Sequence, residues 1–224
     1  MGGAVGTSGS VYIEAGAKRS FACSLEWPGL SRSGKDEAAA LDALSGYVSR
    51  YAEVAGRAGL AFDVTEETSW VVVERVSTRS GGADFGVPTA ILDGDQSDFG
   101  DQEAARTAAL LVASWQTLDE VAAEAPSLLR KGPRGGGRDR DEIVAHVVGA
   151  EQMFAKKVDI KLPVPASGQV EVVRANRAAL ADWCRSGGGA APAAARPGWP
   201  PRYAARRLIW HVLDHAWEIE DRRQ

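Results

Sequence analysis

The three histidines of the chain, His146, His211 and His215, are the residues best suited to chemistry. His211 and His215 stand four positions apart, which places both side chains on one face of a helix. Two imidazoles on one helix and a third from a neighbouring helix can hold one ion and leave coordination positions open, as catalytic sites do. The spacing therefore predicts a metal site for zinc, nickel, iron or copper, the ions that imidazole suits.

Each histidine lies within a stripe of apolar residues at helical spacing, so the three imidazoles are expected to point into a helical assembly. A buried imidazole needs a partner, because an unpaired one costs about 1–3 kcal/mol. The alternative to a shared ion is a separate hydrogen bond from each ring to a carbonyl or to a carboxylate such as Glu142, Asp214 or Glu218. The spacing leaves both interpretations open.

Two carboxylates share a helix face with the histidines. Glu142 lies four residues before His146, and Glu218 lies three residues after His215. Either could orient an imidazole through its second ring nitrogen or act as a fourth ligand. The alternative is ordinary exposed helix charge. No residue is assigned a catalytic role from the sequence.

Composition narrows the partners of the chain. Its 224 residues include 26 Lys and Arg against 30 Asp and Glu, a net charge of −4. This balance argues against binding to nucleic acid or to anionic membranes, so a small-molecule substrate is expected. Cys23 and Cys184 lack the spacing of a redox or metal pair and are expected to be reduced thiols. Without a signal-like start or a bilayer-length apolar run, the chain is expected in the cytoplasm.

The first part of the chain predicts a disordered start at residues 1–10 and a small α+β domain at residues 11–97. Turn residues separate short runs of β-branched and aromatic residues, and one alanine-rich stretch has helical periodicity. A loop follows that is rich in Gly, Asp and Ser. The expected elements are strands at Val11–Glu14, Arg19–Leu25, Phe62–Val64 and Trp70–Val76, a helix running from the Ala38 region to about Gly56, and the loop Ser80–Gly100.

The remainder, residues 98–224, predicts four helices of similar length joined by segments rich in glycine or proline. Such a pattern is typical of an up-down four-helix bundle, so the fold class of the whole chain is expected to be α+β. The expected helices are Gln102–Leu129, Arg138–Val158, Gln169–Ser186 and one that opens at Pro200 or Pro201 and runs to Arg223.

This helical part resembles the DinB-like superfamily of four-helix bundles. The resemblance rests on one histidine in the second helix, within Asp141–His146 and followed by Glu151, and on the closing segment His211–His215. It covers roughly residues 102–223 and implies a divalent ion, often zinc or nickel, held by the three histidines. Members of the superfamily include thiol-dependent S-transferases and a mycothiol-dependent maleylpyruvate isomerase. The alanine, arginine and glycine bias fits a high-GC genome as in actinobacteria, in which mycothiol is the low-molecular-weight thiol.

The N-terminal part is similar, more weakly, to the HicB-type antitoxin domain over residues 11–55. The similarity lies in Val11–Glu14, in Glu26–Leu30 and in the helix opening Gly34–Ala38. In that family this layer can bind a toxin, whereas here a helical region follows it in place of a DNA-binding module. A packing or pocket-closing role for this layer is therefore expected.

The sequence thus favours a metal-dependent enzyme that acts on a small molecule, as a thiol S-transferase or isomerase. Metal coordination raises the thiolate fraction of a thiol near neutral pH and fixes the nucleophile against its target. Two alternatives stay open. Bound water as the nucleophile would make the protein a hydrolase, and an antitoxin-like layer on a helical scaffold would make it a non-catalytic interaction protein.

Overall fold

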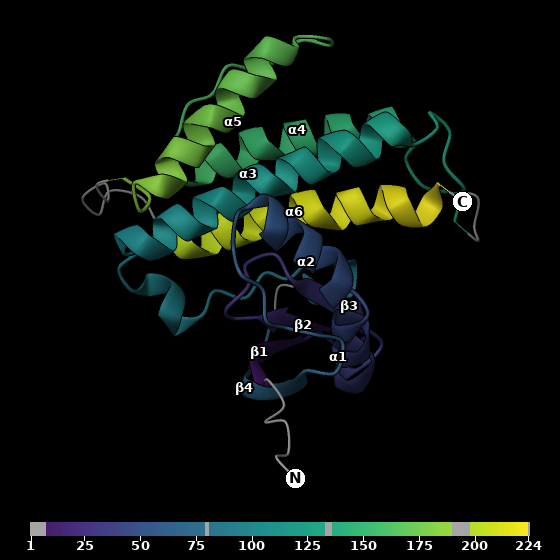
Figure 1. Ribbon diagram of the computed structural model, residues 1–224, viewed down its shortest axis with the longest axis vertical. Helices are drawn as coiled ribbons and strands as arrows, with labels where there is room; N and C mark the ends of the chain where they lie inside the picture. Colours follow the sequence, from purple (N-terminus) through teal and green to yellow (C-terminus); the bar gives the residue numbers. More distant parts are fainter. Residues whose placement is uncertain (1–7, 79–80, 133–135, 190–197, 224) are drawn as a thin grey trace. The chain divides into compact units, whose positions relative to one another are not determined.

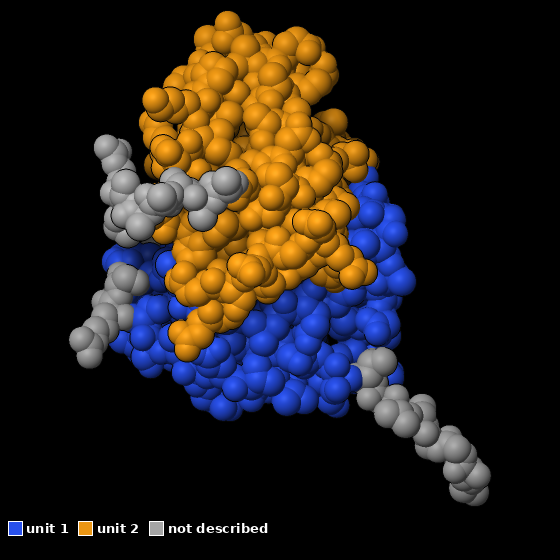
Figure 2. Space-filling view, turned by 90° about the vertical axis from the view of Figure 1, so that its left-hand side faces the viewer, with its two compact units in different colours: residues 1–92 blue, residues 93–224 orange. Residues whose placement is uncertain are grey.

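The computed structural model describes residues 8–78, 81–132, 136–189 and 198–223. The protein belongs to the α+β class, as expected, with a mixed four-stranded sheet and a helical C-terminal region (Figure 1). The chain divides into two compact units, Met1–Leu92 and Asp93–Gln224, so the division precedes the expected boundary at residue 98 (Figure 2). Within the described part of the chain, no helix is long and apolar enough to cross a membrane.

The first unit contains the sheet, with strand order β3-β2-β1-β4. β1 and β2 are antiparallel, which confirms the predicted hairpin, while β4 lies parallel to β1 on its other side. A parallel pair needs a crossover connection, and helices α1 and α2 lie within it. The sequence did not predict β3, because its residues are small or polar and lack the β-branched character of strands. The strands are β1 Ser8–Ala15, β2 Ser20–Ser24, β3 Ser31–Gly34 and β4 Ser69–Ser77.

The prediction of a disordered start was wrong for Ser8, Gly9 and Ser10, which belong to β1. These residues pair in parallel with the beginning of β4, from Ser69 to Val71. Small residues carry little strand signal, so their order comes from this long-range pairing. The rest of that predicted segment, residues 1–7, lies outside the described residues.

Two helices replace the single helix expected to run to about Gly56. α1 spans Glu37–Ser45 and α2 spans Val48–Arg57. The Asp36 side chain caps α1 by accepting a hydrogen bond from the backbone N–H of Ala39 at 2.9 Å. Gly46 ends α1, consistent with the low helix propensity of glycine, and the chain restarts as α2.

The strand predicted at Phe62–Val64 is absent, because this segment has no strand pairing. The Phe62 ring instead packs against Trp27 and Tyr51, with ring centroids 4.7 Å and 5.6 Å away. Its apolar character serves this aromatic cluster. Apolar and β-branched residues over so short a run do not distinguish a strand from a packed loop.

A buried carboxylate fixes the segment that follows β4. Glu14 on β1 is fully buried and accepts hydrogen bonds from the hydroxyls of Thr78 and Thr89 at 3.1 and 3.0 Å. It also accepts from the backbone N–H groups of Thr89 and Ala90, both at 2.9 Å. The predicted loop Ser80–Gly100 is therefore partly anchored, and it contains two short 3₁₀ helices, η1 Ala83–Phe85 and η2 Asp93–Gln96.

The second unit contains the four predicted helices, with ends that differ from the prediction by up to a few residues. α3 contacts α4, α5 and α6, and α4 also contacts α6. α3, α4 and α6 run side by side, and α5 is inclined to them (Figure 1). The largest difference is at the end of α3, which stops at Glu124. The helices are α3 Asp101–Glu124, α4 Arg140–Lys157, α5 Val170–Arg185 and α6 Pro201–Arg222.

Candidate metal centre

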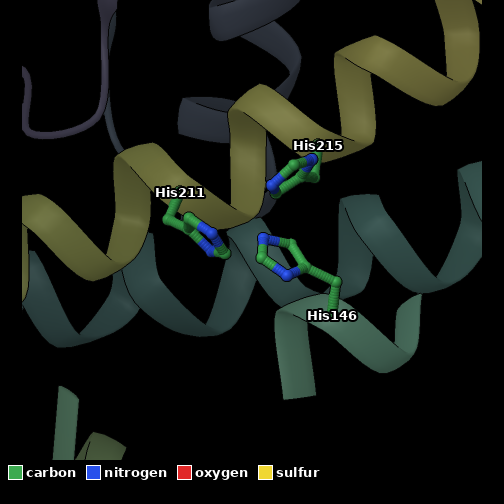
Figure 3. A group of neighbouring side chains, drawn as sticks. All are labelled: His146, His211 and His215. Carbon is green, nitrogen blue, oxygen red and sulfur yellow. The ribbon is translucent and has the colours of Figure 1, made fainter. Parts of the chain in front are cut away.

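The structure brings the three histidines together, His146 from α4 and His211 and His215 from α6 (Figure 3). One potential ligand atom from each ring lies within 4.8 Å of the others. The ring centroids are 5.2 Å apart for His146 and His211, 4.9 Å for His146 and His215, and 4.6 Å for His211 and His215. In a tetrahedral zinc site with zinc–nitrogen distances of about 2.0–2.1 Å, the nitrogens would lie about 3.3 Å apart. The cluster is thus close to the size that one ion requires.

His211 is the most buried of the three, with 8% of its surface exposed. Burial, together with positive charge on His215 and Arg207, lowers its pKa from 6.5 to about 2, so the ring is neutral at physiological pH. Its Nδ1 atom is buried and has no hydrogen-bond partner among the described residues. An unpartnered buried nitrogen costs about 1–3 kcal/mol, and this observation fits a cluster that holds an ion.

His146 is less buried but is affected in the same direction. Burial and the neighbouring charge of His215 lower its pKa below the usual value. Metal ligation by histidine requires the neutral ring, so this environment favours the protonation state that can bind an ion. The cluster therefore suppresses protonation at two of its three members.

Glu218 orients His215. The Nδ1 atom of His215 lies 2.9 Å from Oε2 of Glu218, and the other carboxylate oxygen accepts a hydrogen bond from Arg222 at 2.6 Å. Burial alone would raise the pKa of Glu218, but the hydrogen bonds and charges of His215 and Arg222 outweigh it and lower the pKa. Since an ionised carboxylate only accepts hydrogen bonds, Nδ1 of His215 is the donor, and in the neutral ring this tautomer has its lone pair on Nε2. This is the carboxylate–histidine arrangement found behind many metal ligands.

Glu142, the other carboxylate considered from the sequence, has a different position. It occupies the third residue of α4, where its side chain accepts a hydrogen bond from the backbone N–H of Asp139 at 2.9 Å. The two residues form a capping box that satisfies amide groups at the start of the helix. The candidate cluster in the described chain contains the three histidines without Glu142.

A buried network holds α4, and with it His146, against α3 and α5. Glu151 is 1% exposed and accepts hydrogen bonds from Trp115 on α3 at 2.8 Å and from Arg177 on α5 at 3.2 Å. Arg177 also pairs with Asp119 on α3 at 3.0 Å. Burial raises the pKa of Glu151, while these donors lower it in part. The network fixes the face of α4 that packs into the unit, so it positions the histidine at the edge of that face.

Aromatic rings and an arginine lie near His211. The Phe154 ring meets His211 edge-on with centroids 5.4 Å apart, and Trp199 lies 5.4 Å from Phe154. The guanidinium of Arg207 lies 4.4 Å from the centre of the Trp210 ring. Neither Phe154 nor Arg207 was assigned a functional role from the sequence. Arg207 lies four residues before His211, and residues at this spacing share a helix face. This spacing was the signal in the sequence that could have identified Arg207.

Both cysteines are buried in the structure. Cys184 is fully buried, and burial raises its pKa to about 12, so it carries almost no thiolate at neutral pH. Cys23 is fully buried within β2. Neither thiol belongs to the histidine cluster. A thiolate that reacts at this site would therefore come from a separate molecule.

Comparison of the chain with protein-family models, with curated proteins and with solved structures found no match.

Replacement of Glu218 by glutamine is expected to weaken zinc binding by about 10- to 100-fold, the usual effect of losing a carboxylate behind a histidine ligand. The neutral amide is a weaker acceptor for His215 and places no negative charge behind the ring. Competition with a chromophoric zinc chelator measures the affinity. Glu171→Gln is the matched control, because Glu171 is 81% exposed and pairs with Arg174 on α5. Equal affinities for the two variants would contradict the assigned role of Glu218.

Proposed function

We propose that the protein is a metal-dependent enzyme that acts on a small molecule. In this proposal a divalent ion, zinc or nickel, is held by His146, His211 and His215. The observation that carries the proposal is the convergence of three imidazoles from α4 and α6, with ligand atoms within 4.8 Å of one another. The buried Nδ1 of His211 without a partner and the carboxylate behind His215 support it. The resemblance of residues 102–223 to the DinB-like four-helix bundles supports it further.

For the reaction, we infer transfer or isomerisation that depends on a low-molecular-weight thiol such as mycothiol. A divalent ion with three imidazole ligands would supply positive charge at an open position, which lowers the pKa of a thiol or of water. The buried cysteines of the chain favour an external thiol as the nucleophile. In the transfer reaction its sulfur forms a bond to an electrophilic carbon, the leaving group departs with the bonding electron pair, and the thiol proton passes to solvent.

The residues of the site have separate tasks in this proposal. Neutral His146 and His211 offer nitrogen lone pairs, because burial keeps their pKa values low. Glu218 holds the Nδ1 proton of His215 and so directs the other nitrogen of that ring towards the cluster. The Phe154 ring beside His211 covers one side and excludes water from that part of the site.

The proposal is tested with untagged protein, prepared with and without zinc, and an aromatic chloride as electrophile. Thiol conjugation, followed by absorbance with mycothiol or cysteine as the thiol, is expected to require zinc and to be lost in His146→Ala. Met153→Ala is the control, because Met153 lies on the exposed side of the same helix with 57% of its surface accessible. Failure to bind zinc or nickel would refute the proposal, and product formation without thiol would assign the site to a hydrolase.

A further inference from the structure

The histidine cluster lies in a positively charged environment. The three imidazoles contribute no negative charge, and Glu218, the carboxylate hydrogen-bonded to His215, is shared with Arg222. The charges of Arg207 and Arg138 both act on His211. A divalent ion in the cluster would add two further positive charges. Such a site favours an anion at its open side, because a field of one sign concentrates ligands of the opposite sign.

Arg207 is the cation best placed to meet that anion. It lies one helical turn before His211 on α6 and is 8% exposed, and its charge reaches His211. Its guanidinium is 4.4 Å from the centre of the Trp210 ring and 5.8 Å from that of Phe154. Stacking on aromatic rings holds the planar guanidinium in a defined orientation, so its donors are preorganised for a planar anion.

Aromatic rings near Arg207 and His211 offer apolar surface. Phe154 touches both His211 and Trp199, and Trp199 meets the Tyr203 ring at 4.9 Å. Trp199 is partly exposed, so this aromatic group reaches the protein surface. Lys157 lies over the Trp199 ring at 6.0 Å and adds a further positive charge. These rings therefore provide contacts for the apolar or unsaturated part of a ligand, next to a guanidinium and next to the histidines.

We propose that Arg207 recognises the substrate by binding its carboxylate, and that the substrate is an organic anion whose apolar part lies against Phe154 and Trp199. This inference rests on the proposed function, since it concerns the compound that reacts beside the ion. A guanidinium binds a carboxylate through two parallel hydrogen bonds, which lysine cannot reproduce.

The test uses the full chain loaded with cobalt(II), whose visible absorption reports ligands that enter the site. Benzoate and its neutral analogue benzamide are titrated against the wild type, Arg207→Gln, Arg207→Lys and Arg223→Gln. Arg223 is the matched control, because it caps the same helix and pairs at the surface with Glu124. We expect Arg207→Gln to weaken benzoate binding by about 10- to 100-fold, the effect of losing a charge-assisted hydrogen bond, with benzamide unchanged. Arg207→Lys is expected to weaken benzoate binding several-fold.

The outcomes separate this inference from the proposed function. If the wild type shows no cobalt spectrum, the metal site and the inference both fail. If cobalt binds but Arg207→Gln binds benzoate as the wild type and Arg223→Gln do, Arg207 has no role in recognition and only the inference fails. If Arg207→Gln does not fold, Arg207→Lys decides, and unchanged benzoate affinity in that variant overturns the inference. Equal affinity of the wild type for benzoate and benzamide overturns it as well.

Discussion

His211→Ala is expected to lower the affinity of the protein for zinc by more than about 100-fold, beyond the 10- to 100-fold loss caused by removing a residue that only orients a ligand. The substitution removes one of three nitrogens, and no carboxylate or thiolate belongs to the cluster in the described chain. Two imidazoles from different helices then remain. Elemental analysis of untagged protein after gel filtration, followed by competition with a chelator, measures the loss.

The control for this variant is again Met153→Ala, which leaves all three histidines in place. Circular dichroism establishes that both variants keep their helices before the affinities are compared. Zinc that stays bound stoichiometrically in His211→Ala would show that the ion is held elsewhere. A wild type that binds no zinc or nickel would instead support the alternative in which each buried histidine has its own role in packing.

The metal-free protein is expected to lose about 2 kcal/mol of unfolding free energy between about pH 7 and pH 5 through His211 alone. Burial and neighbouring positive charges lower the pKa of His211 from 6.5 in the reference state to about 2 in the folded state. Below pH 6.5 the unfolded chain therefore binds a proton that the folded chain does not. The stability due to the neutral ring is complete above that pH and declines as the pH falls towards the folded pKa.

Urea unfolding at several pH values, in the presence of a chelator and followed by tryptophan fluorescence, measures this dependence. His211→Gln removes the titrating ring, so its stability should fall less steeply over the same interval. The lowered pKa of His146 also reduces the unfolding free energy as the pH falls, and this contribution is the same in the wild type and in His211→Gln. Parallel curves for the wild type and His211→Gln would contradict the assigned burial of His211.

The long helices and the meeting of the histidines could be anticipated because both depend on local periodicity. A spacing of four residues on α6 and an apolar stripe on α4 are enough to direct the three rings inward. The roles of Glu142 and Glu218 could not be separated in this way, since both lie three or four residues from a histidine. Their difference arises from position, because Glu142 lies in the first turn of its helix, where unpaired amide groups compete for its carboxylate.

Elements that depend on pairing with another segment of the chain were harder to predict. The strand β3 is short and polar and exists through its pairing with β2. The first residues of β1, from Ser8 to Ser10, are ordered by β4, which follows them by about sixty positions. The contact of Arg207 on α6 with Phe154 on α4 joins two helices, so periodicity within one helix does not reveal it.

The anchoring of the segment after β4 has a consequence for how the chain can vary. Two of the hydrogen bonds to Glu14 come from the backbone N–H groups of Thr89 and Ala90, which every residue except proline can supply. The path of this segment is therefore specified by its main chain and by one distant carboxylate. Homologous sequences should exclude proline at position 90, where burial also keeps the side chain small, and they should retain an acidic residue at position 14.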